Sequence, residues 1–299
     1  MIRTPFDLPG RFYKGNLHCH STVSDGGGTP EAVCQFYQNA GYDFISLTDH
    51  FLPEYGFPIT DTTPFRSEHF TTIVGAELHA GRNSNGEIWH ILANGLPLDF
   101  APQQGETGPQ IARRAMDAGA FVTCAHPAWY ALPEADVISL GDVHAIEIIN
   151  GIAYGHNDKI DSTYMLDVML SQGRRYWALA TDDSHFHPQH HDTLMGWSMV
   201  KAESNTPEAL LAALKAGEYY SSEGPDFFNV EIVPGDCVRI ECSPVDSMWV
   251  IGKGSKAVYQ HGNNMRSGEL SIKRWSSNFC RVMIRDRYGR RAWMNPVWW

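Results

Sequence analysis

Residues 12–50, FYKGNLHCHSTVSDGGGTPEAVCQFYQNAGYDFISLTDH, have the pattern of a strand, a helix and a second strand. The first strand is expected over residues 12–20, a β-type run that ends in two histidines. A helix should begin after Thr29, an N-cap residue that is followed by proline, and end at Gly41. Residues 43–50 predict the next strand. This order is typical of an α/β fold with a mostly parallel sheet.

The same alternation continues to about residue 220. We expect further strands at residues 71–79, 88–93, 120–126, 145–150, 176–183 and 197–201, and helices near residues 108–118, 158–172 and 206–216. From about residue 226, short runs of alternating apolar and polar residues predict antiparallel β-structure. The sequence therefore predicts an α/β domain over residues 1–222 and a small all-β, sandwich-like domain over residues 223–299.

The composition is that of a globular protein, with 43% hydrophobic and 19% charged residues among 299. A formal net charge of -11 argues against binding along a nucleic-acid backbone, so no long nucleic acid is expected as a partner. No apolar run is long enough to span a membrane and no secretory signal is visible, which favours a cytoplasmic protein without a membrane partner. The six cysteines form no CxxC pair, so reduced thiols are expected.

Side chains of the metal-binding type follow one predicted strand after another. His18 and His20 close the first strand, and their spacing of two places both imidazoles on the same side. Imidazole and carboxylate ligands suit Zn, Mn or Fe, and carboxylates can bridge two ions. In a β/α barrel the carboxyl ends of the strands converge on one face, so residues far apart in sequence would meet there. The nine candidate ligands are His18, His20, Asp25, His50, Glu77, His90, His126, Asp183 and His185.

These residues resemble the motifs of the polymerase and histidinol phosphatase (PHP) family of metal-dependent phosphoesterases. The resemblance covers roughly residues 11–222 and includes HCH, TDH, a histidine before proline and DSH in that order, with GAE and the histidine of WHIL between them. Residues 283–298, MIRDRYGRRAWMNPVW, are similar to the C-terminal β module of a PHP branch that includes hydrolases of the carbaryl hydrolase type.

The resemblance implies a distorted (β/α)7 TIM-like barrel that binds three divalent metal ions. By this implication the first ion takes His18, His20, Glu77 and Asp183; the second shares Glu77 and adds His90 and His126; the third takes Asp25, His50 and His185. Glu77 and Asp183 would position a bridging hydroxide as the nucleophile, so no serine or cysteine nucleophile is expected. Some members have a histidine where Asp25 stands, a difference that should alter the charge and affinity of the third ion.

Other polar residues near strand ends are weaker candidates. His79 lies, by strand period, on the same side as Glu77, but His90 matches the family spacing better. Asp49 and Asp182 adjoin ligands and are expected either to orient imidazoles or to be exposed carboxylates at strand ends. The candidate substrate-binding residues are Asn150, His187, His191 and Arg82.

The first hypothesis for function is a phosphoesterase that cleaves a small-molecule phosphate ester. The charge of three divalent ions would exceed that of three ligand carboxylates, and such a pocket attracts an anionic substrate. The alternative is a carboxylic-ester or carbamate hydrolase that uses the same metal site, which the C-terminal resemblance favours. A noncatalytic scaffold is disfavoured by the intact ligand set. The connection over residues 51–68 is rich in aromatic residues and proline and is expected to shape specificity.

Overall fold

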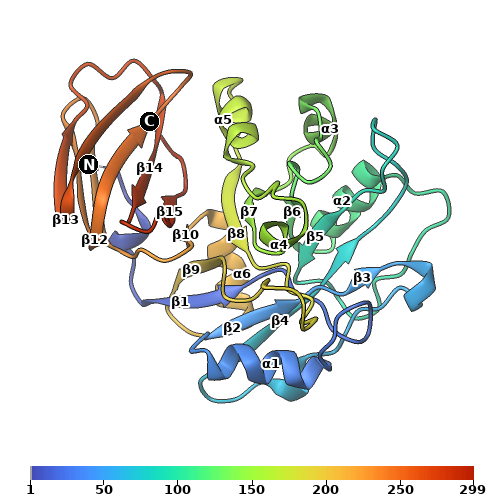
Figure 1. The fold of residues 1–299 in the computed structure, drawn as a ribbon. Helices are drawn as coiled ribbons and strands as arrows, with labels where there is room; N and C mark the ends of the chain where they lie inside the picture. The colour runs from blue at the N-terminus through green and yellow to red at the C-terminus, as the bar shows by residue number, and fades with distance from the viewer. Residues whose placement is uncertain (1) are drawn as a thin grey trace.

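Strands alternate with helices over the first three-quarters of the chain (Figure 1). The computed structural model describes residues 2–299. The strands of this part are β1 (Arg11–Asn16), β2 (Phe44–Leu47), β3 (His50–Phe51), β4 (Thr71–Leu78), β5 (Ile91–Asn94), β6 (Phe121–Cys124), β7 (Ala145–Asn150), β8 (Trp177–Thr181), β9 (Trp197–Ala202) and β10 (Tyr219–Ser222). The helices are α1 (Pro30–Asn39), α2 (Gly108–Asp117), α3 (Glu134–Ser139), α4 (Ala153–His156), α5 (Thr163–Ser171) and α6 (Pro207–Ala216), with short 3-10 helices at Pro5–Asp7, Pro53–Tyr55 and Thr63–Phe65.

The helices begin and end where local sequence signals place them. The Thr29 side chain accepts a hydrogen bond from Ala32 N at the start of α1, and Gly217 ends α6 with a left-handed φ of 73°. The helix predicted over 158–172 starts late, because Asp161 forms a β-bridge with Ile149 and keeps the preceding segment extended. Within residues 2–299, no helix has the length and apolar character needed to cross a membrane.

The sheet is only partly parallel. Its strands hydrogen-bond in the order β9–β1–β2–β4–β5–β6–β7–β8, with parallel pairs in β1–β2–β4 and β6–β7–β8. Strand β5 is antiparallel to both of its neighbours, and β9 is antiparallel to β1. The α/β class is confirmed, but the expectation of a mostly parallel sheet is met only in part. Because β5 is reversed, its first residues lie at the edge where β4 and β6 end.

The chain beyond β1 meets the chain beyond β8 at this same edge. Asp183 N donates to His18 O at 2.9 Å, and His20 N donates to Ser184 O at 2.8 Å. These bonds bring the two outer parts of the sheet together where the strands end. The closed (β/α)7 barrel that the resemblance implies stays a prediction.

Apolar side chains cover both faces of the sheet. On one face, α2, α3 and α5 pack against the strands, and Ile111, Val137 and Leu166 join Val122 and Ile146 in one buried cluster. On the other face, Leu210 and Leu214 of α6 contact a second cluster that contains Phe121, Leu92 and Ile73. Strand β7 is buried along its whole length, as expected for a strand covered on both faces.

The antiparallel β-structure predicted for the C-terminal part is confirmed. It comprises β11 (Phe227–Val233), β12 (Cys237–Ile251), β13 (Ala257–Ser271), β14 (Phe279–Arg285), β15 (Arg291–Met294) and β16 (Val297–Trp298), which lie to one side of the helices in Figure 1. Val238, Val250 and Val282 belong to its separate apolar cluster. Strand β15 pairs with β10, so hydrogen bonding continues from the first part of the chain into this one. The domain boundary at residue 222 stays a prediction.

Candidate metal centre

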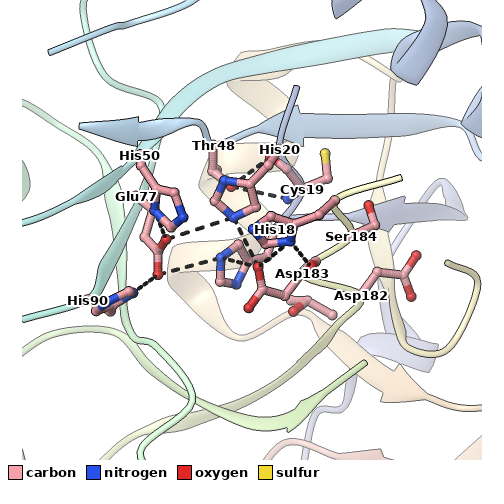
Figure 2. Close-up of polar contacts among 12 residues, drawn as sticks. His18, Cys19, His20, Thr48, His50, Glu77, His90, Asp182, Asp183 and Ser184 are labelled. Atoms are coloured by element: carbon pink, nitrogen blue, oxygen red, sulfur yellow. Dashed lines mark hydrogen bonds and ion pairs between the residues drawn. The ribbon is translucent and has the colours of Figure 1, made fainter. Parts of the chain in front are cut away.

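All nine predicted ligands gather at the edge of the sheet where the strands end. Figure 2 shows His18, His20, His50, Glu77, His90 and Asp183 close together there. His18 and His20 follow β1, and Glu77 is the penultimate residue of β4. His90 directly precedes β5 and reaches Glu77 because that strand runs in the opposite direction. Topology thus brings together side chains from the two halves of the α/β region.

The innermost group consists of His18, His20, Glu77 and Asp183, all of which are buried. The Oδ1 atom of Asp183 lies 3.1 Å from His18 Nε2 and 3.0 Å from His20 Nε2. The Glu77 carboxylate completes the group, with Oε1 3.6 Å from His18 Nε2 and Oε2 3.8 Å from His20 Nε2. These four residues are the set that the resemblance assigns to a first ion.

Glu77 connects this group to His90 and His126. Its Oε1 lies 2.7 Å from His90 Nδ1 and 3.2 Å from His126 Nε2, as expected for the second set. The Tyr130 hydroxyl lies 2.7 Å from His90 Nε2 and supports the other side of the ring. Tyr130 could not be predicted from the sequence, because nothing in the local pattern after His126 shows that its hydroxyl turns back toward the centre.

The third set, Asp25, His50 and His185, lies nearer the surface. Asp25 is separated by 3.4 Å from His50 Nε2 and by 3.5 Å from His185 Nε2, and its side chain is 41% exposed. His20 faces this set as well, with Nδ1 4.0 Å from Asp25 Oδ1. His20 therefore lies between the first and third sets, a shared position that the resemblance did not imply.

Two of the candidate ligands have unusual backbone conformations. Asp183 has a φ of 52° and His126 a φ of 22°, both in the left-handed region that non-glycine residues avoid. Such strain costs about 1–3 kcal/mol per residue and persists only where the surroundings hold it. The Asp183 backbone is held through its bond to His18 O, and its Oδ2 accepts a hydrogen bond from Asn150 Nδ2 at 2.9 Å.

Buried Glu147 determines which nitrogen of His18 faces the centre. Its Oε1 lies 2.8 Å from His18 Nδ1, and a carboxylate can only accept, so Nδ1 carries the proton and Nε2 has a lone pair. This lone pair points toward the oxygens of Glu77 and Asp183. Lone pairs that converge in a buried space repel one another unless a cation lies between them, so these residues fit a divalent metal ion.

Unpartnered atoms lead to the same conclusion. Among the buried polar atoms of residues 2–299 that lack a hydrogen-bond partner are His18 Nε2, His20 Nδ1, His126 Nδ1 and Glu77 Oε2. Buried polar atoms in proteins are nearly always hydrogen-bonded or bound to a metal. Several of these atoms lie within one cluster, which indicates that their lone pairs are available to bind a metal ion.

The charges of the cluster shift the pKa values of its members. Burial alone would raise the pKa of the Asp183 carboxyl, but neighbouring His18, His20 and His185 lower it well below its ordinary value. Burial alone would lower the pKa of His50, but Glu77 and Asp25 raise it to about 10. In the absence of metal, Asp183 therefore stays charged and His50 keeps its proton.

A cavity of about 280 Å³ opens onto the cluster. Its outer wall consists of Trp129, Tyr130, Ile152, His156, His187 and His190. In the part of the chain that the structure describes, no lysine or arginine lines this cavity. Residues 51–68 do not line it either, although the Tyr55 ring stacks on His50 with centroids 6.5 Å apart. The expected role of that connection in specificity stays a prediction.

The four candidate substrate-binding residues have different positions. His187 lines the cavity, whereas His191 and Arg82 do not. The Arg82 guanidinium donates instead to Gly86 O at 2.6 Å. Asn150 is buried, and its amide donates to Asp183 and to Glu147, so it holds the two carboxylates rather than facing the cavity.

Asp49 and Asp182 serve neither of the two roles expected for them. Both carboxylates are buried, and neither contacts an imidazole. Asp49 accepts hydrogen bonds from Ser21 N at 2.8 Å and from neighbouring hydroxyls. Asp182 accepts from the three consecutive backbone N–H groups of residues 194–196 and from a tyrosine hydroxyl. They anchor the loops that carry ligands, which local sequence cannot show because their partners lie in other segments.

Comparison with known proteins supports the fold. No protein-family model matches the sequence, and no curated protein does either. Among solved structures, a two-domain protein from Bacteroides vulgatus ATCC 8482 that contains a predicted PHP-like metal-dependent phosphoesterase is 17% identical. The match covers 93% of this chain and 92% of that one, with a TM-score of 0.54.

A second structure, from Bifidobacterium adolescentis ATCC 15703, belongs to a protein proposed to be a metal-dependent phosphoesterase. It is 14% identical, with a TM-score of 0.42, and the match covers 58% of this chain and 89% of that one. The fold comparison depends on the first structure, whose match includes both the α/β region and the C-terminal strands. Over nearly its whole length, this chain has the fold of a two-domain PHP-like protein.

Proposed function

We propose that the protein is a metal-dependent hydrolase of the PHP family that cleaves a small phosphate ester at a centre of three divalent ions. The observation that carries the proposal is the convergence of nine imidazole and carboxylate side chains, several with unpartnered buried atoms, at one end of a cavity. Structural packing alone does not account for so many ligand-type groups whose lone pairs face one another.

The three ligand sets are those given above, with His20 available to both the first and the third. When bound, divalent ions lower the pKa of a coordinated water toward neutrality and stabilise the charge that develops on phosphate oxygens. Mn, Zn and Fe all suit a mixed set of imidazole and carboxylate ligands. The Glu77 carboxylate contacts histidines of both the first and the second set, so it would be available to hold either ion.

The chain's own residues orient the ligands and hold the substrate. Glu147 keeps the Nε2 lone pair of His18 directed into the centre, and Asn150 fixes the Asp183 carboxylate. His187 and the outer wall of the cavity would contact the group that leaves. Cys19 lies between two ligands, but its Sγ is buried and contacts Ser46 O at 3.4 Å, so it is not placed to act as a nucleophile.

A second candidate function is the hydrolysis of a carboxylic ester or a carbamate. The observation that favours it is the wall of the cavity, which consists of aromatic, aliphatic and imidazole side chains without lysine or arginine among the described residues. A phosphate monoester commonly receives guanidinium or ammonium contacts in addition to metal. In this cavity the metal ions would have to supply nearly all of the positive charge.

Three nitrophenyl substrates separate these functions: p-nitrophenyl phosphate, bis(p-nitrophenyl) phosphate and p-nitrophenyl acetate, each given to manganese-loaded protein. Phosphate turnover that disappears in Glu77→Gln is the expected result. Acetate turnover with inert phosphates would support the ester and carbamate alternative. Cys19→Ser is the matched control, because it changes a buried neighbour of the ligands without removing one, and it should keep wild-type rates.

The two parts of the chain have different roles in this proposal. We expect residues 1–222 to form the distorted (β/α)7 barrel and to carry the whole centre. Residues 223–299 contribute no ligand to the sets above. The buried Arg281 of β14 forms a bidentate ion pair with Asp167 of α5 at 2.7 Å, so this region is fastened to the rest of the chain.

A further inference from the structure

His79 is a buried histidine beside the centre that none of the three ligand sets uses. It follows β4 directly, two residues after Glu77, and its side chain has no exposed surface. Its Nε2 lies 2.9 Å from His50 Nδ1, and its Nδ1 lies 2.8 Å from the carbonyl oxygen of Trp89. Both ring nitrogens are therefore hydrogen-bonded, and the direction of each bond can be worked out.

The backbone carbonyl determines the direction of the whole chain of bonds. Trp89 O can only accept, so His79 Nδ1 must donate its proton to it. In a neutral ring the other nitrogen then carries a lone pair, so His79 Nε2 accepts. The proton of the bond between the two histidines must come from His50 Nδ1.

The Trp89 carbonyl, which accepts the first of these hydrogen bonds, is held in a fixed place. The Trp89 indole is buried, and it packs directly against Gly108 at the start of α2, where a Cβ would come within 2.3 Å of the ring. The carbonyl that orients His79 therefore belongs to a residue whose place is determined by close packing of a helix on the sheet.

Two consequences follow for the centre. When His50 Nδ1 donates to His79, its Nε2 is the nitrogen that faces Asp25, at 3.4 Å, together with His20 and His185. In addition, Glu77 Oε2 lies 2.7 Å from His50 Nδ1, so a proton on this nitrogen faces both His79 and the carboxylate. Both contacts favour the tautomer of His50 that leaves the lone pair on Nε2.

We propose that His79 is a positioning residue for His50. Its hydrogen bond to the Trp89 carbonyl sets the tautomer of His79, and this tautomer requires His50 to donate through Nδ1, so that His50 Nε2 faces the third metal ion. The part that concerns metal affinity rests on the proposed function, whereas the tautomer of His79 does not. Outer hydrogen-bond partners of metal-binding histidines act in this way, and their loss typically costs about 10–100-fold in metal affinity. The competing role is direct ligation, since His79 also groups with His50, Glu77 and His90.

Nitrogen-15 NMR of histidine-labelled protein tests the tautomer directly, first after removal of metal by chelation and then after loading with diamagnetic zinc. We expect a neutral His79 with its proton on Nδ1 in both states and, in the zinc form, a proton on His50 Nδ1. A proton on His79 Nε2, or an Nε2 shift typical of a zinc-bound nitrogen, would overturn the proposal. If no zinc binds to the wild type, the proposed metal centre fails, while the tautomer in metal-free protein still decides the orientation of His79.

Two substitutions separate positioning from ligation. His79→Gln keeps an acceptor, the amide oxygen, near the place of Nε2, whereas His79→Phe keeps a ring but removes the acceptor. We expect His79→Phe to weaken the binding of one zinc ion about 10–100-fold in equilibrium dialysis, and His79→Gln to retain most of that affinity. Equal loss in the two variants, or wild-type affinity in His79→Phe, would refute the positioning role. If His79→Phe does not fold, the Gln variant and the NMR measurement still decide.

Discussion

Replacing Glu147 by glutamine tests whether hydrogen bonds behind the centre determine the state of its ligands. Each oxygen of the Glu147 carboxylate accepts two donors. Oε1 accepts from His18 Nδ1 at 2.8 Å and from Thr181 Oγ1 at 2.5 Å, and Oε2 accepts from His126 N at 2.7 Å and from Asn150 Nδ2 at 3.1 Å. In Glu147→Gln one of these oxygens becomes an NH2 group, which donates and cannot accept.

The loss of stability in Glu147→Gln depends on which of the four donors can adjust to the new NH2 group. A hydroxyl such as that of Thr181 can rotate and accept, and the Asn150 amide can flip, but the backbone N–H of His126 cannot change. His18 can adapt only by moving its proton to Nε2, which removes the lone pair from the centre. About one charge-assisted hydrogen bond is therefore lost, and we expect a decrease of about 1.5–3 kcal/mol in the free energy of unfolding of metal-free protein. Zinc affinity should fall about 10–100-fold.

Urea denaturation of metal-free protein and equilibrium dialysis with zinc measure the two effects separately. Asp136→Asn is the matched control, because that buried carboxylate accepts hydrogen bonds from Ser84 N and Oγ at 3.1 and 2.7 Å but lies outside the centre. It should lower stability without changing zinc affinity. Wild-type zinc affinity in Glu147→Gln would refute the reasoning, because His18 would then keep its lone pair without Glu147.

Further outcomes are expected at other contacts. Tyr130→Phe removes the hydroxyl 2.7 Å from His90 Nε2 and should lower zinc affinity about tenfold in dialysis without loss of fold. Because Glu77 and Asp25 raise the folded pKa of His50 to about 10, the contribution of His50 to the stability of metal-free protein should be fully present below the ordinary histidine pKa and be lost as pH rises toward 10. Urea denaturation across this range, with His50→Gln lacking the decrease, checks the sign. Asp167→Asn removes the negative charge beside buried Arg281 and leaves one amide oxygen to accept from its guanidinium, so about one charge-assisted hydrogen bond is lost, and the free energy of thermal unfolding should fall by about 1.5–3 kcal/mol.

Much of the candidate site could be predicted from the sequence because its ligands follow strands. A hydrophobic run that ends in a histidine or an aspartate can be recognised from neighbouring residues alone, so the sequence was enough to identify His18, His126 and Asp183 as candidates. The carboxyl ends of parallel strands share one edge, which is why residues far apart in the chain could be expected to meet. Helix ends at Thr29 and Gly217 were predictable for the same reason, since capping is local.

Other features of the site depend on contacts between distant segments. Glu147 stands in the buried run IEIIN, and an acid in such a run indicates a partner but does not say which. Its partner, His18, is 129 positions away, and the opposite direction of β5, which brings His90 to Glu77, is likewise decided by strand pairing across the sheet. Periodicity gives the side of a strand on which a residue lies, not the residue it meets.

By itself, the sequence determined the class of fold, the edge of the sheet at which the candidate ligands gather and the residue types found there, because each follows from patterns within a few neighbouring residues. Only the tertiary structure decided which ring nitrogen of His18 faces the centre, that Asn150 holds carboxylates, and that His79 joins the Trp89 carbonyl to His50. The physical reason is that a hydrogen bond depends on the distance and direction between two groups, and in a buried site the packing of the whole chain sets both.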